Sequence, residues 1–379
     1  MLKTSLILFT ITSIIFSTIY TPQALLPTLK EVFHISIAET NLLLSVMLFV
    51  LMVVTPFYAP LAHRFEKKKI MMVAIFLLFV SVLLSALATN FFWLLVARIL
   101  QGMFVPGITA LMLSYVPELY PENKRGLGMG IYMAATGFGA VMGRLLAGWV
   151  SYLYSWREAF GIFAMLLLVA LVLMAWGLPK SKHTKSSTKF DINKFLSYLK
   201  DRKILSILLI PMVVFFSFMA MTTFVTYHLA LSPYSLNESQ LGSLFLVLLL
   251  AVVVSPIAGR MTDKISRVKI IYFGLISLII GLFLTLLNPL SMVIVGLGFI
   301  TIGMFTVQSV APTYLATLEP KDKTMIAVAY QSFFYFGGAM GTLVPSWVWG
   351  CCGFSGVVWL CVGLLMFGIG FLAIVNQKK

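Results

Sequence analysis

Two arginines stand inside long apolar stretches of the chain, where a charged side chain is rare. Arg98 lies within residues 93–115, and Arg144 lies within residues 127–150. A guanidinium keeps its charge and presents five N–H donors in a planar fork, so it suits a carboxylate or a group of backbone carbonyls. For Arg98 we weigh proton transfer or ligand contact against a structural bond to neighbouring carbonyls. For Arg144 we weigh contact with an anionic group against a cap on an opposing helix end.

Acidic partners for these arginines are missing from the interior of the apolar stretches. We place each of the 12 Asp and Glu residues in a loop or at the end of a stretch. For Glu31 we favour a position in an outer loop after the first stretch, with a deeper position in the membrane as the alternative. A desolvated acid is the usual proton carrier inside a membrane, so its absence weakens the case for proton coupling. His228 titrates near neutrality and could carry protons instead; the alternative is a hydrogen-bonded polar residue at a membrane edge.

Motifs for covalent or metal chemistry are also missing from the sequence. There is no nucleophile elbow, no phosphate-binding loop and no cluster with metal-ligand spacing. Cys351 and Cys352 are adjacent, which leaves a redox role open, but we favour small apolar fillers. We therefore expect no catalytic residue, no metal and no cofactor, and we do not expect an enzyme.

The stretches that hold these residues are suited to lipid. The chain has 379 residues, of which 60% are hydrophobic and 10% charged, and its mean hydropathy is +1.02. Runs of about 20 apolar residues are long enough to cross a ~30 Å hydrocarbon core as helices. The sequence therefore predicts an all-α membrane protein with twelve transmembrane helices. Their expected limits are 4–26, 39–61, 70–90, 93–115, 127–150, 158–178, 205–230, 237–259, 269–288, 290–315, 325–347 and 354–375.

The net charge of +15 comes from connections that alternate along the chain. Most of the 27 Lys and Arg residues lie in every second connection and at the two ends. This asymmetry is the positive-inside pattern, and it predicts that those connections and both termini face the cytoplasm. Because membrane topology accounts for the net positive charge, the charge is no reason to expect a nucleic-acid partner. The partners we expect are the lipid bilayer and a small molecule, and we expect a monomer.

The two halves of the chain repeat one another. Residues 1–178 are expected to form one six-helix bundle and residues 205–379 a second, joined by a cytoplasmic linker at 179–204. The second part of the linker has the apolar spacing of an amphipathic surface helix, with a solvated linker as the alternative. Six spans is an even number, so both bundles start on the same side. Such parallel repeats place a ligand site between the bundles near mid-membrane.

Matching residues in the same order support this duplication. Residues 36–39 and 235–238 both read S-x-x-E, and we expect each to be a capping box at a helix start. The other pairs are Gly102 with Gly303, Tyr132 with Tyr330, Ala140 with Gly338, Gly143 with Gly341, and Trp149 with Trp347.

Charged loop motifs connect the sequence to a known family. Residues 259–269, GRMTDKISRVK, keep most of the pattern G-x-x-x-D-[RK]-x-G-[RK]-[RK]. Residues 59–69, APLAHRFEKKK, are a degenerate copy in which His63 and Glu66 replace Asp and Gly. Two further motifs lie in the apolar stretches: R-x-x-x-G from Arg98, and G-x-x-x-G-P-x-x-G-G of antiporters, with Arg144 in place of proline. On these motifs the chain resembles the major facilitator superfamily over its whole length.

Further stretches resemble the YnfM-like group of bacterial inner-membrane permeases. They are residues 20–27 (YTPQALLP), GRLLAG and TVQSVAP. That group is described as drug or sugar exporters, so the resemblance implies multi-pass insertion in the bacterial inner membrane, efflux, and proton-coupled antiport. It also implies alternating access with gates at the charged loops. The gating residues would be His63, Arg64, Asp263, Lys264 and Arg267, with the intact clamp at Asp263.

A central cavity lined by the first, fourth, seventh and tenth spans would hold the substrate, with help from the fifth, eighth and eleventh. Its walls are aromatic, methionine and amide side chains with little charge, which suits amphiphilic molecules; many of these residues could instead pack helices. The candidate substrate-binding residues are Tyr20, Gln23, Arg98, Gln101, Tyr132, Arg144, Thr223, Tyr227, His228, Gln308, Tyr330 and Gln331.

The leading hypothesis is a secondary transporter that exports a small amphiphilic or weakly anionic molecule. A sugar or organic-anion carrier, working as a uniporter, is the alternative, and a lipid flippase of the same fold comes third. A non-transporting scaffold or an integral enzyme would need catalytic groups or a large soluble domain, and the sequence contains neither.

Overall fold

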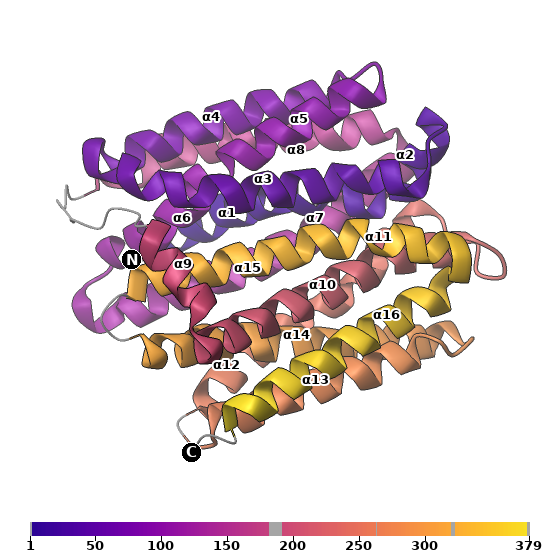
Figure 1. The fold of residues 1–379 in the computed structure, drawn as a ribbon. Helices are drawn as coiled ribbons and strands as arrows, with labels where there is room; N and C mark the ends of the chain where they lie inside the picture. Colours follow the sequence, from indigo (N-terminus) through magenta and orange to yellow (C-terminus); the bar gives the residue numbers. More distant parts are fainter. Residues whose placement is uncertain (1, 182–191, 263, 320–322, 377–379) are drawn as a thin grey trace. The chain divides into compact units, whose positions relative to one another are not determined.

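The computed structural model describes residues 2–181, 192–262, 264–319 and 323–376, and within these ranges it is helical with no strand (Figure 1). Its contacts divide the chain into two compact units. The first unit comprises Met1–Phe190 and Leu236–Leu246, and the second comprises Asp191–Ser235 and Val247–Lys379. A short piece of the second sequence repeat therefore packs within the first unit.

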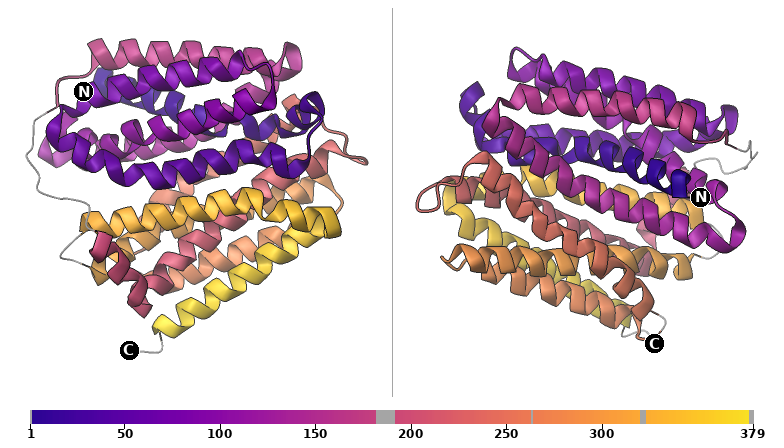
Figure 2. Two further views of the ribbon diagram at one scale, coloured as in Figure 1. Left: turned by 45° about the horizontal axis from the view of Figure 1, so that its top comes forward. Right: turned by 180° about the vertical axis from the view of Figure 1, so that it is seen from behind.

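The first unit contains six long helical segments and a short helix from the second repeat. Its α-helices are α1 (Leu2–Tyr20), α2 (Leu26–Phe33), α3 (Ile37–Arg64), α4 (Lys67–Ala86), α5 (Phe91–Phe104), α6 (Pro106–Tyr115), α7 (Arg125–Leu153), α8 (Trp156–Gly177) and α11 (Glu238–Leu244). Its 3-10 turns are η1 (Thr21–Ala24), η2 (Val116–Leu119) and η3 (Glu122–Lys124). α1 packs along α7, and α4 packs along α8 and α5 (Figure 2).

The second unit is built in the same way from the second half of the chain. Its helices are α9 (Ile192–Lys200), α10 (Arg202–Ala230), α12 (Leu250–Met261), α13 (Arg267–Leu284), α14 (Leu290–Leu318), α15 (Lys323–Leu343) and α16 (Pro345–Asn376). The 3-10 turn η4 (Phe245–Leu249) joins α11 to α12. α13 packs along α14, and α10 packs along α15 and α16. The amphipathic segment predicted in the linker forms α9.

The all-helical architecture predicted from the apolar stretches is confirmed. Among the described residues, eleven segments are long and apolar enough to cross a membrane, and α15 supplies the remaining long helix. Several boundaries differ from the predicted limits by a few residues, and the largest difference lies between the last two spans. α15 ends at Leu343, and α16 begins at Pro345 instead of at residue 354. Proline is favoured at the first turn of a helix, where its missing N–H costs nothing. α16 then bends at Gly353, whose φ of 59° suits glycine.

The two predicted capping boxes had different outcomes. Ser36 caps α3: its Oγ accepts from Glu39 N at 3.2 Å, while Glu39 Oε2 accepts from Ser36 N at 2.8 Å. The box expected at Ser235 is wrong, because α11 starts two residues later. Asn237 is the N-cap there, with Gln240 completing the box. Asn and Ser are equally good caps, so the S-x-x-E pattern could not separate the two starts.

One packing contact recurs in the two units and supports the duplication. In the first unit, a side chain at Gly143 of α7 would collide with the backbone oxygen of Ser17 in α1. In the second unit, a side chain at Gly341 of α15 would collide with the backbone oxygen of Phe216 in α10. Small residues let membrane helices approach this closely. The glycine pair matched in the sequence therefore performs the same structural task in each half.

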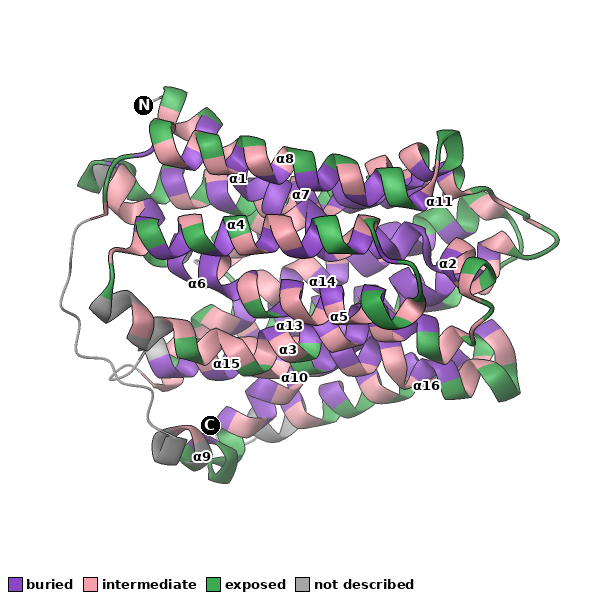
Figure 3. Cartoon of the chain, turned by 90° about the horizontal axis from the view of Figure 1, so that it is seen from above, coloured by how far each residue is buried: buried purple, intermediate pink, exposed green. Residues whose placement is uncertain are grey.

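Large apolar side chains cover the outer faces of the long helices. Figure 3 shows buried and exposed residues on different faces of α8 and α16. The side chains of Trp176, Phe367 and Phe57 are 88%, 68% and 67% exposed. Such faces would be unfavourable in water and are typical of helices that lie against lipid.

Candidate functional site

The end of α1 presents two polar side chains toward α7. α1 closes at Tyr20, and the chain tightens into the 3-10 turn η1, which has Pro22 in its first turn. Thr21 Oγ1 donates to Ser17 O at 2.9 Å and fixes the transition. The turn carries Gln23, which is fully buried. The two candidates Tyr20 and Gln23 therefore lie together.

Arg144 of α7 lies against this turn and is 1% exposed. Its Nε donates to Gln23 Oε1 at 2.6 Å, and its Nη1 donates to Ala140 O at 2.6 Å. The second bond runs back one turn along α7, as expected for helical side chains that lean toward the N-terminus. The guanidinium carbon also lies 4.2 Å from the ring centroid of Tyr20. Three of the predicted residues are thus brought into one cluster.

A residue that the sequence did not suggest completes the cluster. Phe245 follows α11 directly, is 1% exposed, and has its ring centroid 4.9 Å from the Arg144 guanidinium carbon. α11 can bring it there because Gly242 lies against the backbone of α7 at Arg144. Residues three apart share a helix face, so Phe245 lies above the same patch as Gly242. We call Tyr20, Gln23, Arg144 and Phe245 the Arg144 cluster.

The positive charge of the Arg144 cluster has no acidic partner among the described residues. Arg144 Nη2 is buried and donates no hydrogen bond. The buried charged side chains in the described ranges are Lys68, Arg98 and Arg144, with no Asp or Glu. An isolated charge away from water is costly, so an anion bound beside Arg144 would lower the cost of burying its charge.

Arg98 of α5 is in a different situation, although it is also fully buried. Its Nε donates to Leu43 O at 2.9 Å, and its Nη2 donates to Ile19 O at 2.8 Å. Its Nη1 donates to Thr18 O at 3.1 Å and to Gln101 Oε1 at 2.5 Å. These bonds tie α5 to α1 and α3. The arrangement favours the structural alternative for Arg98.

Gln101 and Tyr132 also make bonds within the first unit. Gln101 is fully buried on α5, and its Nε2 donates to Ser85 Oγ at 2.8 Å and to Ser81 O at 3.2 Å. Tyr132 of α7 is 3% exposed, and its hydroxyl donates to Thr109 O at 3.2 Å. The bonds of Gln101 connect α5 to α4, and that of Tyr132 connects α7 to α6. Both residues therefore serve packing in this conformation.

Three candidates of the second unit lie near the C-terminal end of α10. Thr223 is fully buried and Tyr227 is 4% exposed. Tyr227 lies 6.3 Å from Trp349 between ring centroids. The imidazole of His228 stacks on Phe354 at 4.3 Å with an angle of 1° between the rings. Tyr227 and His228 thus form an aromatic cluster with Trp349 and Phe354 where α10 meets α16.

The other candidates of the second unit come from α14 and α15. Tyr330 is 6% exposed, and its ring lies 5.9 Å from that of Phe334, which stacks on Phe215 at 3.9 Å. The hydroxyl of Tyr330 is buried and makes no hydrogen bond. Gln308 and Gln331 are half-buried. The second unit therefore offers aromatic faces and amides, without a buried charge in its described residues.

The predicted gating residues are only partly described. Asp263 lies outside the described residues, as do the side chains of His63 and Arg64 at the end of α3. Lys264 is exposed, and Arg267 begins α13 half-buried. The basic residues beside His63 have clear partners. Lys67 Nζ lies 2.6 Å from Glu118 Oε1, and Lys68 Nζ donates to Ala175 O at 2.8 Å and Leu178 O at 2.6 Å, at the end of α8.

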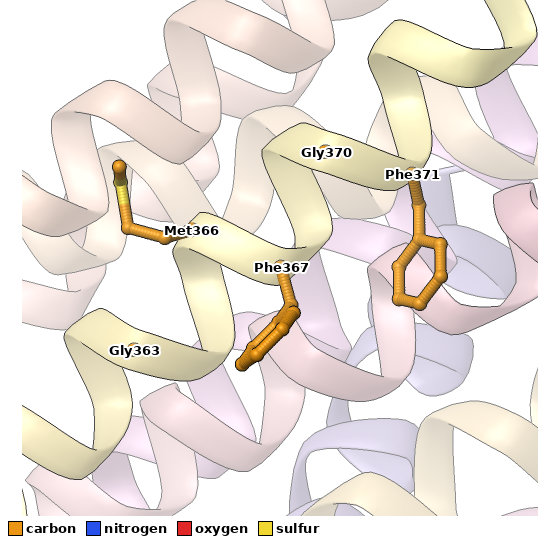
Figure 4. Close-up of a pocket in the computed structure, with 5 residues that line it drawn as sticks. All are labelled: Gly363, Met366, Phe367, Gly370 and Phe371. Carbon is orange, nitrogen blue, oxygen red and sulfur yellow. The ribbon is translucent and has the colours of Figure 1, made fainter.

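A surface groove lies on α16. It is lined by Gly363, Met366, Phe367, Gly370 and Phe371, all from one helix (Figure 4). The two glycines leave gaps between the large side chains. None of the lining side chains carries a charge or a hydrogen-bonding O or N atom, and Met366 and Phe367 are more than half exposed. The groove is therefore an uneven lipid-facing surface and offers nothing to orient a ligand.

Long apolar helices in two halves, with one contact that recurs in both, are those of a multi-pass membrane protein with an internal repeat. The Major Facilitator Superfamily matches the chain over residues 6–341. The chain therefore belongs to this superfamily, and it is a secondary transporter of small molecules and not an enzyme.

Relatives of similar length support this assignment. The chain is 29% identical to the uncharacterized MFS-type transporter YybF of Bacillus subtilis over 357 residues, which covers 93% of this chain and 87% of the relative. It is 26% identical to the inner membrane transport protein YnfM of Escherichia coli over 363 residues, covering 94% and 86%. The predicted resemblance to the superfamily and to YnfM is confirmed.

Solved structures share the fold at low sequence identity. A bacterial homologue of the human lysosomal transporter Spinster, in an inward-facing and occupied conformation, has a TM-score of 0.79 at 15% identity and covers 99% of this chain and 96% of its own. The human organic anion transporter MFSD10 has a TM-score of 0.72 at 14% identity, covering 98% and 99%. At these identities the likeness concerns the fold alone.

Proposed function

We propose that this transporter exports a small amphiphilic or weakly anionic molecule, a drug or metabolite, from the cytoplasm by alternating access. The observation that carries the proposal is the Arg144 cluster. It combines aromatic rings, an amide and a cation inside a membrane protein. Rings accept apolar bodies of varied shape, and the amide and cation orient a polar or anionic group.

The outward direction rests on the YnfM-like motifs, because the group that they resemble is described as exporters. The positive-inside pattern predicts that both termini face the cytoplasm, but this orientation is common to importers and exporters. Proton coupling rests on the antiporter motif at residues 139–148, since no described Asp or Glu is buried. The two six-helix bundles predicted from the sequence, residues 1–178 and residues 205–379, would be the two bodies that move relative to each other.

Inside-out membrane vesicles would test export. The probes are 2-naphthoylglycinate, which has an aromatic body and one carboxylate, its neutral amide, glucose and a lysophosphatidylcholine. We expect uptake of the naphthoyl probes that depends on the protein and rises when the vesicle interior is made acidic. Vesicles that lack the protein are the control.

Other outcomes would change the assignment. Uptake of glucose alone would favour the sugar carrier, and movement of the lysolipid alone would favour a flippase. Uptake that ignores the pH gradient would remove antiport and leave a uniporter of organic anions.

A further inference from the structure

We infer that the Arg144 cluster is a receptor for one carboxylate group and that the transported molecule is a monocarboxylate with an apolar body. The inference rests on the proposed function and narrows its substrate class. It begins from the hydrogen bonds of the guanidinium. Nε and Nη1 are occupied by Gln23 and by the Ala140 carbonyl, whereas Nη2 is buried without an acceptor.

The geometry of the free donors fits a planar anion. Nη2 carries two N–H groups in the plane of the guanidinium, and carboxylates bind arginine in that plane. The rings of Tyr20 and Phe245 have their centroids 4.2 and 4.9 Å from the guanidinium carbon. They hold the plane in position and offer apolar surface to the rest of the ligand.

Charge decides between a carboxylate and a phosphate. The three ion pairs of the described residues are Lys67 with Glu118, Lys69 with Glu66, and Arg125 with Glu122, so none involves Arg144. The cluster therefore offers one unit of positive charge. A carboxylate neutralises it, whereas a phosphate monoester carries about −1.5 to −2 at neutral pH and would leave a buried negative excess.

Gln23 is a neutral hydrogen-bond partner of Arg144, and this matters for the charge of the cluster. Its Oε1 accepts from Arg144 Nε, while the backbone carbonyl of Ala140 accepts from Nη1. The guanidinium is thereby held by neutral acceptors, which do not cancel its charge. A carboxylate in place of Gln23 would have removed the attraction for an anionic substrate.

Binding to the purified full-length protein tests the inference. The ligands are 2-naphthoylglycinate, its amide and 2-naphthyl phosphate, measured by calorimetry in nanodiscs. We expect the wild type to bind the carboxylate at least about tenfold more tightly than either other ligand. Arg144→Gln should weaken carboxylate binding at least about tenfold, and Arg144→Lys should weaken it less, because it keeps the charge and loses the fork.

Arg157→Gln is the matched control. The guanidinium carbon of Arg157 also lies over an aromatic ring, 4.3 Å from the ring centroid of Trp156, and its Nη2 donates to Ala88 O at 3.1 Å. Unlike Arg144, Arg157 is exposed, at the start of α8. Its replacement should leave carboxylate affinity unchanged. A monodisperse elution profile shows that Arg144→Gln is folded, and Arg144→Lys serves where it is not.

Three results would overturn the inference: no carboxylate binding by the wild type, equal binding of the amide or phosphate, or unchanged affinity in folded Arg144→Gln. The vesicle experiment tests export independently of carboxylate binding. Carboxylate binding without uptake would remove export and keep the receptor. Uptake of the neutral amide alone would keep export and remove the receptor.

Discussion

At the scale of single residues, the protein uses the same side chain in two ways. Arg98 and Arg144 are both buried in the first unit. Arg98 directs four hydrogen bonds to acceptors on three helices, whereas Arg144 keeps one nitrogen without a partner. In the first arrangement every guanidinium nitrogen donates to an acceptor of the protein, which stabilises the fold; in the second, one nitrogen remains for a ligand. Burial alone would not have separated them.

This difference predicts that replacing Arg98 lowers the stability of the protein, whereas replacing Arg144 does not. Arg98→Gln leaves the carbonyls of Thr18, Ile19 and Leu43 without their donor, so we expect a loss of about 3 kcal/mol in the free energy of unfolding. Arg144→Gln removes a charge that nothing compensates, and its unfolding temperature should equal or exceed that of the wild type. Thermal unfolding in detergent, followed by tryptophan fluorescence, measures both. Equal losses in the two variants would show that Arg144 is a structural residue as well.

At the scale of elements, the short helix α11 sets the shape of the Arg144 cluster. It packs on α7 within the first unit, and the chain enters the second unit directly after Leu246. Trp149 Nε1 donates to Ser243 Oγ at 3.1 Å, and Thr28 Oγ1 donates to Glu238. Phe245 thus lies where a helix of the second repeat leaves the first unit. A movement of η4 would therefore move the ring away from the guanidinium.

Gly242→Ala should disturb this arrangement. An added Cβ would lie 2.8 Å from Arg144 O and 3.2 Å from Leu145 O, so α11 would have to move away from α7. We expect a loss of about 1–3 kcal/mol in stability and weaker binding of 2-naphthoylglycinate, because Phe245 moves with the helix.

Gly161→Ala in α8 is the control, since a Cβ there meets nothing within 4 Å. Thermal unfolding and calorimetry on the two variants measure the effects. If Gly242→Ala matched Gly161→Ala in both, the close approach would not be what positions Phe245.

At the scale of the whole molecule, the duplicated charged loops are expected to control opening toward the cytoplasm. In the first unit Lys67 pairs with Glu118 and Lys68 caps the end of α8, so the degenerate loop is held within its own unit. The second loop keeps the family's aspartate, Asp263. We propose that the intact clamp is the second one.

Asparagine substitutions would compare the two loops. Asp263→Asn removes a negative charge from a basic loop and should slow vesicle uptake several-fold, whereas His63→Asn removes no fixed charge and should change uptake little. Uptake is normalised to the amount of protein in the membrane. Equal rates in the two variants would contradict a single intact clamp.

The sequence predicted the fold well because membrane insertion depends on local hydropathy and charge. The twelve apolar stretches, the glycine pair at 143 and 341 and the linker helix all follow from patterns within a few turns. Phe245 was missed because its position depends on α11 approaching α7, two helices far apart in the chain. A signal was available in Gly242-x-x-Phe245, but nothing local says that this glycine would meet the backbone of Arg144.

The uncompensated charge of Arg144 has an electrical consequence. With a carboxylate bound, the cluster is neutral; without one, it carries one positive charge. A membrane potential acts on a charge that crosses it with about 2.3 kcal/mol per 100 mV. A negative cytoplasm would therefore draw the empty site inward and leave the loaded site indifferent to voltage. In inside-out vesicles the outer face corresponds to the cytoplasm. A potassium diffusion potential that makes the vesicle interior positive should therefore speed uptake, because it returns the empty carrier to the cytoplasmic face for the next substrate molecule.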